Sequence, residues 1–213
     1  MTTIAFDLDG TLIDSVPHMH HAVNTVLTEM DLPAVDIATL RSFVGHGLPP
    51  LISKLLAHLD QPEAMHGLLY DRVLAAYTSH PNDPKALYPG VIETLTTLKA
   101  QGHRLTLCTN KPGAATKTVL RDTGLAPFFD IVIAGDTLDS RKPEPAMLFA
   151  ALEGAEDALY VGDSEVDAET AQRAGIRFAL YTEGYRKTPV TEIPHDMAFS
   201  DYADLLRFCA PVA

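Results

Sequence analysis

The sequence contains little cysteine, few basic residues and no long apolar run, and each shortage excludes a class of protein. The two cysteines, Cys108 and Cys209, are too few for a disulfide framework or a zinc site, so we expect both to be reduced. The 16 basic residues face 28 acidic ones, for a formal charge of −12, which disfavours nucleic-acid and anionic-membrane binding because both need clustered Lys and Arg. No stretch approaches the ~20 apolar residues of a membrane span, and no signal peptide is visible. We therefore expect a cytoplasmic protein with no nucleic-acid and no membrane partner.

What the sequence does contain is an alternation of short apolar segments with amphipathic stretches. The apolar segments are rich in β-branched and aromatic residues and are bounded by turn residues, which is typical of buried strands. The stretches between them have helical periodicity, and several end at a glycine. This alternation predicts an α/β fold, with a Rossmann-like parallel sheet covered by helices on both faces. The predicted strands are residues 3–6, 104–108, 130–134, 158–162 and 176–181.

One region interrupts the alternation. Residues 15–83 contain no convincing strand, whereas helical patterns occur at 48–59 and 63–79. Ser15 is a suitable cap for a first helix that carries Pro17 in its first turn. The expected domains are an all-helical insertion at 15–83 and an α/β core made of 1–14 and 84–213.

Two acidic residues, Asp7 and Asp9, follow the first predicted strand directly. Side chains two apart on a strand point the same way, so both carboxylates should project into one space at the carboxyl end of the sheet. That edge is where ligands of open α/β sheets bind, and Gly10 allows a sharp turn there. Taken alone, the Asp-Leu-Asp-Gly segment is equally consistent with a simple turn, because Asp and Gly are common turn residues.

Polar residues also follow other predicted strands. Thr109 and Asn110 come directly after the second strand. Asp163 comes after the fourth strand, with Asp167 one helical turn further. Lys142 lies just before a predicted helix. Each has an ordinary explanation by itself, as a loop hydroxyl, a helix cap or a surface lysine, but their occurrence at matching strand ends favours one shared polar site.

Four segments of the chain, DLDGT, TN, KPEP and GDSEVD, resemble the four ordered motifs of the haloacid dehalogenase superfamily. The helical insertion after the first segment resembles the cap domain of that family. Other stretches, including DGTLIDSVPH, FVGHGLPPLI and TNKP, resemble its phosphoglycolate phosphatase group. The resemblance implies a Mg²⁺-dependent phosphatase of a small phosphate monoester, with 2-phosphoglycolate as the expected substrate. Its partner would be a small anionic phosphorylated metabolite, and the sequence leaves both monomer and homodimer open.

The resemblance also assigns roles to the polar residues. Asp7 would attack phosphorus to form an aspartyl-phosphate, and Asp9 would protonate the leaving oxygen and later activate water. Mg²⁺ would be held by the Asp7 carboxylate, the Asp9 backbone carbonyl and the Asp163 carboxylate, with Asp167 in support. The residues expected to bind phosphate or substrate are Gly10, Thr11, Asn110 and, from the cap, His46, together with Thr109 and Lys142, which are also expected to be catalytic.

Several cap residues have two interpretations. FVGHGL places two glycines around His46, which fits either a mobile loop over the site or a turn between helices. Arg41 and Lys54 could pair with a substrate carboxylate, although a solvated helix face is typical of such residues. His18 and His21 could share a helix face, but no further ligand is spaced to complete a metal site.

Asp9 distinguishes between related chemistries. Haloacid dehalogenases share the fold but lack an acid–base Asp at this place, so Asp9 favours phosphate chemistry. A phosphomutase keeps both acids and stays an alternative, as does a phosphatase of another small metabolite. Outside enzymes, response-regulator receivers also combine acids, a hydroxyl and a lysine on a parallel sheet, but they are shorter and have no helical insertion. A non-catalytic binding protein of this fold would be expected to have lost Asp7 or Asp9.

Overall fold

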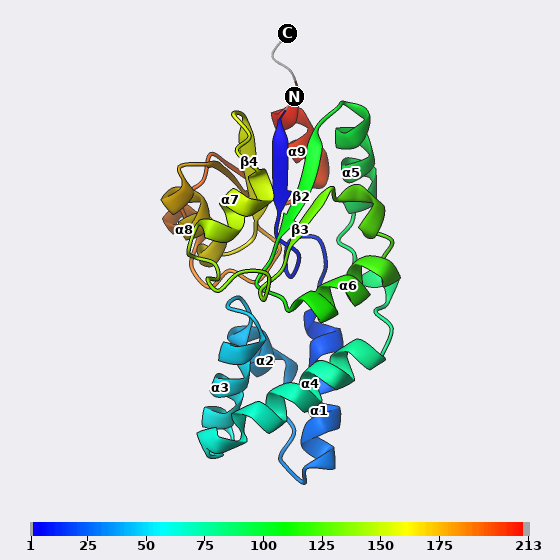
Figure 1. Cartoon of the computed structure of the whole chain (residues 1–213), viewed down its shortest axis with the longest axis vertical. Helices are drawn as coiled ribbons and strands as arrows, with labels where there is room; N and C mark the ends of the chain where they lie inside the picture. Colours follow the sequence, from blue (N-terminus) through cyan, green and yellow to red (C-terminus); the bar gives the residue numbers. More distant parts are fainter. Residues whose placement is uncertain (1, 211–213) are drawn as a thin grey trace.

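Six parallel strands form the centre of the computed structural model, which describes residues 2–210 (Figure 1). They lie in the order β3-β2-β1-β4-β5-β6, so the first strand of the chain is central and has β2 and β4 as neighbours. The strand order reverses at β1, and open α/β sheets bind ligands in the crevice at such a point. The strands are β1 Thr3–Phe6, β2 Arg104–Cys108, β3 Ile131–Ile133, β4 Ala158–Gly162, β5 Arg177–Tyr181 and β6 Met197–Phe199.

The predicted α/β fold with a parallel sheet is confirmed. Strands β1, β2 and β4 have the expected bounds, and β3 and β5 are slightly shorter than expected. Strand β6 was not predicted from the sequence. Its three residues are too few to show a period of their own, and pairing with the edge of β5 defines them as a strand.

Alternating side chains of the strands build two apolar layers, one on each face of the sheet. From β1, Ile4 and Phe6 enter the first layer and Ala5 enters the second, as the two-residue repeat of a strand requires. Figure 1 shows α5 and α9 on one side of the sheet and α7 and α8 on the other. Burial on both faces explains why the strands have nearly continuous apolar sequences. The helices of the core are α5 Val91–Ala100, α6 Gly113–Asp122, α7 Ala146–Leu152, α8 Glu165–Ala174 and α9 Tyr202–Cys209, with 3-10 turns η2 Pro84–Ala86, η3 Ala126–Phe128 and η4 Val190–Glu192.

Residues 16–79 fold into four α-helices that lie below the carboxyl edge of the sheet in Figure 1. Helix α4 packs against both α1 and α3. The insertion shares its apolar interior with the core, because Leu40 and Leu55 belong to the same buried cluster as Phe6. We propose that the cap domain is 15–83 and that the core domain combines 1–14 with 84–213. The helices are α1 Val16–Glu29, α2 Ile37–Phe43, α3 Leu48–His58 and α4 His66–Ser79, with the 3-10 turn η1 Glu63–Met65 before α4.

The expected helix cap at Ser15 is wrong. Helix α1 begins at Val16 with Pro17 in its first turn, but the Ser15 backbone is already helical, with φ −84° and ψ −10°. A capping side chain normally needs an extended backbone to reach the free amides of the first turn. The Ser15 hydroxyl is instead buried without a hydrogen-bond partner among the described residues.

The helices of the described chain are short compared with the thickness of a bilayer. Across residues 2–210, no helix is both long enough and apolar enough to cross a membrane. The longest helices, α1 and α4, have 14 residues each, which falls short of the roughly 20 that a span requires.

Side chains of the central strands are fully buried, so truncating one of them should be costly. Leu107 of β2 has no exposed surface, whereas Leu138, in the connection after β3, is 37% exposed. We expect Leu107→Ala to lower the free energy of unfolding by about 2–5 kcal/mol, because it removes buried apolar surface and leaves a cavity. The matched change Leu138→Ala should cost less than about 0.5 kcal/mol. Urea denaturation followed by circular dichroism measures both, and equal losses would contradict this core.

Candidate active site

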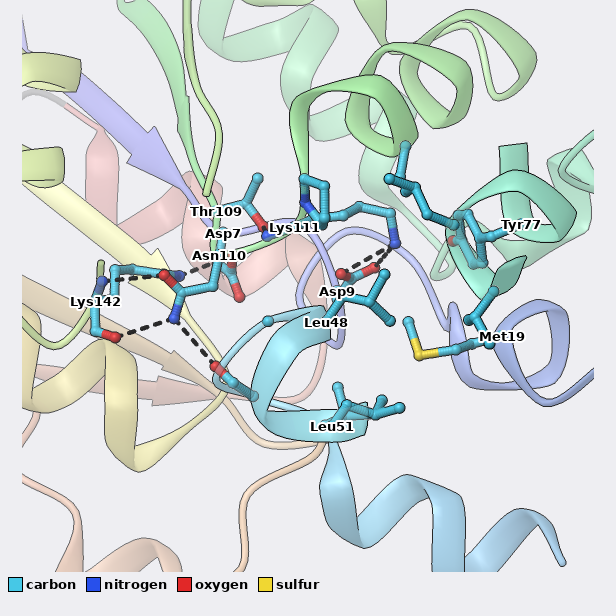
Figure 2. Close-up of a pocket in the computed structure, with 17 residues that line it drawn as sticks. Asp7, Asp9, Met19, Leu48, Leu51, Tyr77, Thr109, Asn110, Lys111 and Lys142 are labelled. Carbon is cyan, nitrogen blue, oxygen red and sulfur yellow. Dashed lines mark hydrogen bonds and ion pairs between the residues drawn. The ribbon is translucent and has the colours of Figure 1, made fainter. Parts of the chain in front are cut away.

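The loops after β1, β2 and β4 meet at the carboxyl edge of the sheet, because these three strands are neighbours. Asp7 directly follows β1, and its backbone N–H donates to the Val161 carbonyl of β4 at 2.9 Å. The structure therefore gathers most of the predicted site residues around one pocket, which Figure 2 shows. Those that line this pocket or the cavity beside it are Asp7, Asp9, Thr109, Asn110, Lys142, Asp163 and His46.

Lys142 connects Asp7 to Asp167. Its Nζ lies 2.9 Å from Asp7 Oδ1 and 2.7 Å from Asp167 Oδ1, and it donates to the Tyr160 hydroxyl at 2.7 Å. Only 2% of the lysine side chain is exposed. Burial opposes the charged form, but the carboxylates of Asp167 and Asp7 raise the pKa of the Lys142 ammonium above its usual value. The lysine is therefore charged, and it orients Asp7 from within the core.

Asp163 is held in place by the turn after β1 and by a later loop. Its Oδ1 accepts from the Thr11 hydroxyl at 2.9 Å, and its Oδ2 accepts from the Tyr185 backbone N–H at 2.6 Å. Gly10 makes this close approach possible, because it has φ +89° and a Cβ there would lie 2.4 Å from Asp163 Oδ2. The Thr11 hydroxyl is thus engaged by Asp163, and a contact of Gly10 and Thr11 with phosphate stays a prediction.

Asp167 has two sets of partners at the start of α8. One oxygen faces Lys142, and the other accepts from the Ser164 hydroxyl at 2.6 Å and from the Ser164 backbone N–H at 3.2 Å. The backbone hydrogen bond is part of a capping box at the helix N-terminus. Burial opposes ionisation of Asp167, but Lys142 and the hydrogen bonds lower its pKa below the usual range. The carboxylate is therefore ionised and fixed in orientation.

The carboxylates of Asp7, Asp163 and Asp167 form a candidate metal site. One oxygen from each lies within 4.8 Å of the other two. Burial raises the pKa of Asp7 to about 6, although Lys142 opposes the shift. Burial, together with Asp167 and Asp7, raises the pKa of Asp163 well above its usual value. These raised values mean that the protein alone does not fully compensate the negative charge.

The buried carboxylates of this cluster outnumber the ammonium groups beside them. The cluster holds four carboxylates and two ammonium groups, so full ionisation leaves two negative charges, four minus two. One divalent cation matches this excess, and carboxylate oxygens are ligands that hard divalent cations prefer. The residues present therefore fit a divalent metal ion. The charged groups are Asp7, Asp9, Asp163, Asp167, Lys111 and Lys142.

Asp9 has a cation of its own, Lys111, which sequence reasoning did not identify. The Lys111 Nζ lies 2.8 and 3.1 Å from the two Asp9 oxygens, and only 2% of the lysine side chain is exposed. A lysine in a loop is usually solvated, so its residue type gave no signal. Its position directly after Thr109 and Asn110, at the end of β2, and its place in the TNKP segment were the available indications.

A sequence model of the haloacid dehalogenase-like hydrolase family matches residues 4–181. The chain belongs to this family. Its curated relatives include a phosphoglycolate phosphatase from Cereibacter sphaeroides, 45% identical over 97% of this chain and 98% of the relative. A phosphoglycolate phosphatase from Rhodospirillum rubrum is 38% identical over 95% of this chain and 88% of the relative.

Solved structures of similar proteins agree with the family. A predicted phosphoglycolate phosphatase from Haemophilus somnus has a TM-score of 0.90 and 29% identity, over 99% of this chain and 98% of that chain. CbbY from Rhodobacter sphaeroides, in complex with phosphate, has a TM-score of 0.82 and 22% identity, over 96% of both chains, and shows the fold alone. The resemblance inferred from the four motifs is therefore confirmed, and the receiver alternative is excluded.

In this haloacid dehalogenase-like hydrolase, Asn110 ties the cap to the core. Its side chain accepts from the Lys142 backbone N–H at 3.0 Å and donates to the carbonyls of Lys142 and Gly45 at 3.1 and 3.3 Å. The cap loop also comes close to the Asn110 backbone, since a Cβ on Gly47, which has φ +83°, would lie 2.6 Å from the Asn110 carbonyl oxygen. The Asn110 side chain thus positions loops, and its predicted contact with phosphate stays a prediction.

His46 lies in the same cap loop and lines a second cavity of about 290 Å³ together with Asp163 and Lys187. Burial and the nearby ammonium groups of Lys54 and Lys187 lower the pKa of the His46 imidazole. A neutral imidazole can donate or accept a hydrogen bond but does not attract an anion. Its predicted role in substrate binding stays a prediction.

The histidines of the HMHH segment do not converge on a metal. His18 Nε2 hydrogen-bonds to the Tyr77 backbone carbonyl at 3.1 Å, and the His21 ring packs edge-on against His80. Across residues 2–210, one group of potential metal ligands is present, and it consists of the three buried acids. These histidines instead support the packing of α1 against the end of α4.

Tyr160 is a second site residue that was not predicted from the sequence, because it lies within the apolar sequence of β4. Its hydroxyl accepts from Lys142 Nζ and donates to Asp167 Oδ1 at 2.8 Å.

We expect Tyr160→Phe to lower the free energy of unfolding by about 1–3 kcal/mol, because both charged partners lose a buried hydrogen bond. Tyr88→Phe is the matched control, since the Tyr88 hydroxyl lies 3.5 Å from its partner carbonyl, and it should cost less than about 0.5 kcal/mol. Chemical denaturation that finds equal losses would contradict this arrangement.

Proposed function

We propose that this hydrolase is a magnesium-dependent phosphatase whose substrate is 2-phosphoglycolate. The observation that carries the proposal is the pairing of two carboxylates with two separate lysines at one sheet edge, Asp7 with Lys142 and Asp9 with Lys111. Two acids in different surroundings can take the two roles that ester hydrolysis needs, nucleophile and proton carrier. The choice of substrate is supported by the full-length relatives named phosphoglycolate phosphatase.

The first step forms an aspartyl-phosphate on Asp7. An Asp7 oxygen attacks phosphorus, the bond from phosphorus to the leaving oxygen breaks, and Asp9 gives its proton to that oxygen. Lys142 holds Asp7 in position and attracts the phosphoryl oxygens. The Thr109 hydroxyl accepts from the Lys111 backbone N–H at 3.3 Å, so its own proton is available to a phosphoryl oxygen.

The second step returns the enzyme to its starting state. Asp9, now ionised, takes a proton from a water molecule, and the oxygen of that water attacks phosphorus. The bond between phosphorus and the Asp7 oxygen breaks, which releases phosphate and frees the Asp7 carboxylate. Asp9 is then protonated again and ready for the next ester.

The proposed metal is Mg²⁺, held by the carboxylates of Asp7 and Asp163 and the backbone carbonyl of Asp9, with Asp167 in support. When bound, it would neutralise the charge between the nucleophile and the phosphate. The three buried carboxylates of Asp7, Asp163 and Asp167, with one oxygen of each within 4.8 Å of the other two, support a divalent cation at this place. Thr11 and the Tyr185 backbone fix the direction of the Asp163 carboxylate.

The proposed setting is the cytoplasm, where a monomer or homodimer meets a small anionic phosphorylated metabolite. Cys108 and Cys209 are both free, and Cys108 is buried. Free cysteines agree with a reducing compartment, where disulfides are rare.

A panel of phosphate esters tests the proposed reaction. We expect 2-phosphoglycolate to have a higher kcat/KM than phosphoserine, sugar phosphates and nucleotides. Asp7→Asn should lower kcat for every ester by at least about 1,000-fold, because an amide is not a nucleophile, while its circular dichroism spectrum stays unchanged. A folded Asp7→Asn variant with near-normal turnover would contradict the mechanism. A low rank for 2-phosphoglycolate would contradict the substrate and leave the mechanism intact.

A thermal melt tests the metal without using turnover. At pH 7.5, Mg²⁺ at 100 times its Kd should raise Tm by roughly 5–10 °C, because it binds the native state. The shift should shrink below pH 6, because protonation of Asp7, whose pKa is raised to about 6, competes with metal binding. Asp163→Asn should abolish the shift, whereas Asp130→Asn, an exposed acid before β3, should keep it. An equal shift in both variants would contradict the site.

A further inference from the structure

We propose that Lys111 and Tyr77 bind the carboxylate of the substrate, so that the enzyme selects short phosphorylated acids over uncharged phosphate esters. This inference rests on the phosphatase function proposed above and adds the residues that recognise the leaving group. Lys111 lies in the core loop after β2, and Tyr77 lies near the end of the cap helix α4. Figure 2 shows the Lys111 ammonium and Tyr77 on the side of Asp9 that faces away from Lys142.

Lys111 is a buried cation with a hydrogen-bond donor to spare. Its ammonium forms an ion pair with the Asp9 carboxylate, and 2% of the lysine side chain is exposed. An ammonium has three N–H donors. Among the described residues, Asp9 takes two of them, through its two carboxylate oxygens. The Nζ atom also lies 4.3 Å from the centre of the Tyr77 ring, so the donor that Asp9 does not take is available to an anion beside that ring.

The position of Lys111 matches the position of a short leaving group. In the proposed mechanism Asp9 protonates the ester oxygen, so this oxygen must lie next to the Asp9 carboxyl group. In 2-phosphoglycolate the carboxylate carbon is two bonds from that oxygen. The Lys111 ammonium lies directly against the Asp9 carboxyl, at 2.8 and 3.1 Å from its oxygens. A carboxylate two bonds from the ester oxygen therefore comes within reach of the Lys111 N–H that Asp9 does not take.

Tyr77 supplies a second, independent indication of a ligand. Its side chain is buried, with 3% of the residue exposed, and its hydroxyl has no hydrogen-bond partner among residues 2–210. A buried hydroxyl without a partner is costly unless a ligand or water completes it. The Lys111 Nζ lies 4.3 Å from the centre of the Tyr77 ring. A carboxylate on the ammonium would thus be beside the ring and would give the hydroxyl an acceptor.

The remaining walls of the pocket are apolar and leave little space beside Lys111 and Tyr77. They are formed by apolar side chains, and the cavity holds about 40 Å³, which is the space of a few water molecules at roughly 10–15 Å³ each. Asp7, Thr109 and Lys142 line the same pocket, so the phosphoryl group shares this space and a short leaving group fits better than a sugar or nucleoside. An uncharged alcohol of the same length would leave Lys111 and Tyr77 unpaired in apolar surroundings, which lowers affinity. The apolar walls are Met19, Leu48, Leu51, Val73 and Leu74.

Other cations near the site are less well placed for this role. Arg41, which the sequence suggested as a carboxylate partner, pairs with Asp14 at 3.8 Å and has 48% of its side chain exposed. Lys54, the other suggestion, does not belong to the residues that line this pocket. Lys187 lines the second cavity, and its Nζ donates to the Val44 carbonyl at 3.5 Å. Lys187 is therefore a suitable control, because it is a nearby lysine outside the pocket.

A comparison of two esters tests the inference. Ethyl phosphate has the same length as 2-phosphoglycolate but carries a methyl group where the latter carries the carboxylate. For the unaltered enzyme we expect kcat/KM to favour 2-phosphoglycolate by at least about 100-fold. Lys111→Met also removes the partner of Asp9, so both esters should be hydrolysed more slowly. The decisive quantity is the preference, which should fall by at least about tenfold.

Two further variants complete the experiment. Tyr77→Phe keeps every charge and should lower the preference about threefold to tenfold, so it serves even where Lys111→Met does not fold. Lys187→Met should leave the preference unchanged within about twofold. If Lys111→Met and Tyr77→Phe slow both esters equally, the residues have only a structural role and the inference is wrong. If the unaltered enzyme does not favour 2-phosphoglycolate over the wider panel, the proposed substrate fails instead, so the two failures are distinguishable.

Discussion

The balance of charge at the carboxyl ends of β1 and β4 is the constraint on which the rest of the site depends. Carboxylates can be buried side by side only where cations or hydrogen bonds compensate them. Lys142 lies between Asp7 and Asp167, whereas Lys111 lies on Asp9. Two acids that are neighbours in sequence are therefore in different surroundings. That difference supports the proposed division of labour between a nucleophile and a proton carrier.

The acids of this site could be predicted because each follows an element that is recognisable from local sequence. An apolar run ends at Asp7, another ends before Asp163, and one helical turn separates Asp163 from Asp167. A parallel sheet then brings the ends of neighbouring strands to one edge whatever lies between them in sequence. The topology of the sheet thus places these carboxylates together. Recognising where each strand ends in the sequence is enough to predict that they meet.

Lys111, Tyr160 and β6 could not be predicted, because their roles depend on contacts between distant parts of the chain. Lys111 meets Asp9 across 102 positions of sequence, and no local period records such a pair. Tyr160 lies in an apolar strand, and only the position of Lys142 turns its hydroxyl into part of the site. The three residues of β6 become a strand by pairing with β5. Asn110 was predicted as a site residue because it follows β2. Its contacts with Gly45 and Lys142 show that it positions loops, which its residue type did not indicate.

The cap and the core meet at the same residues that are proposed to recognise the substrate. The Lys111 ammonium of the core lies over the Tyr77 ring of the cap, and Asn110 of the core binds the Gly45 carbonyl of the cap. A carboxylate held by both Lys111 and Tyr77 would add to the attraction between the two units. A ligand shifts a conformational equilibrium only by its difference in affinity between the two states. An ester with the right carboxylate would therefore favour the arrangement in which the Lys111 ammonium lies over the Tyr77 ring. An uncharged ester lacks this contribution, so the contact between cap and core would itself take part in selecting the acid.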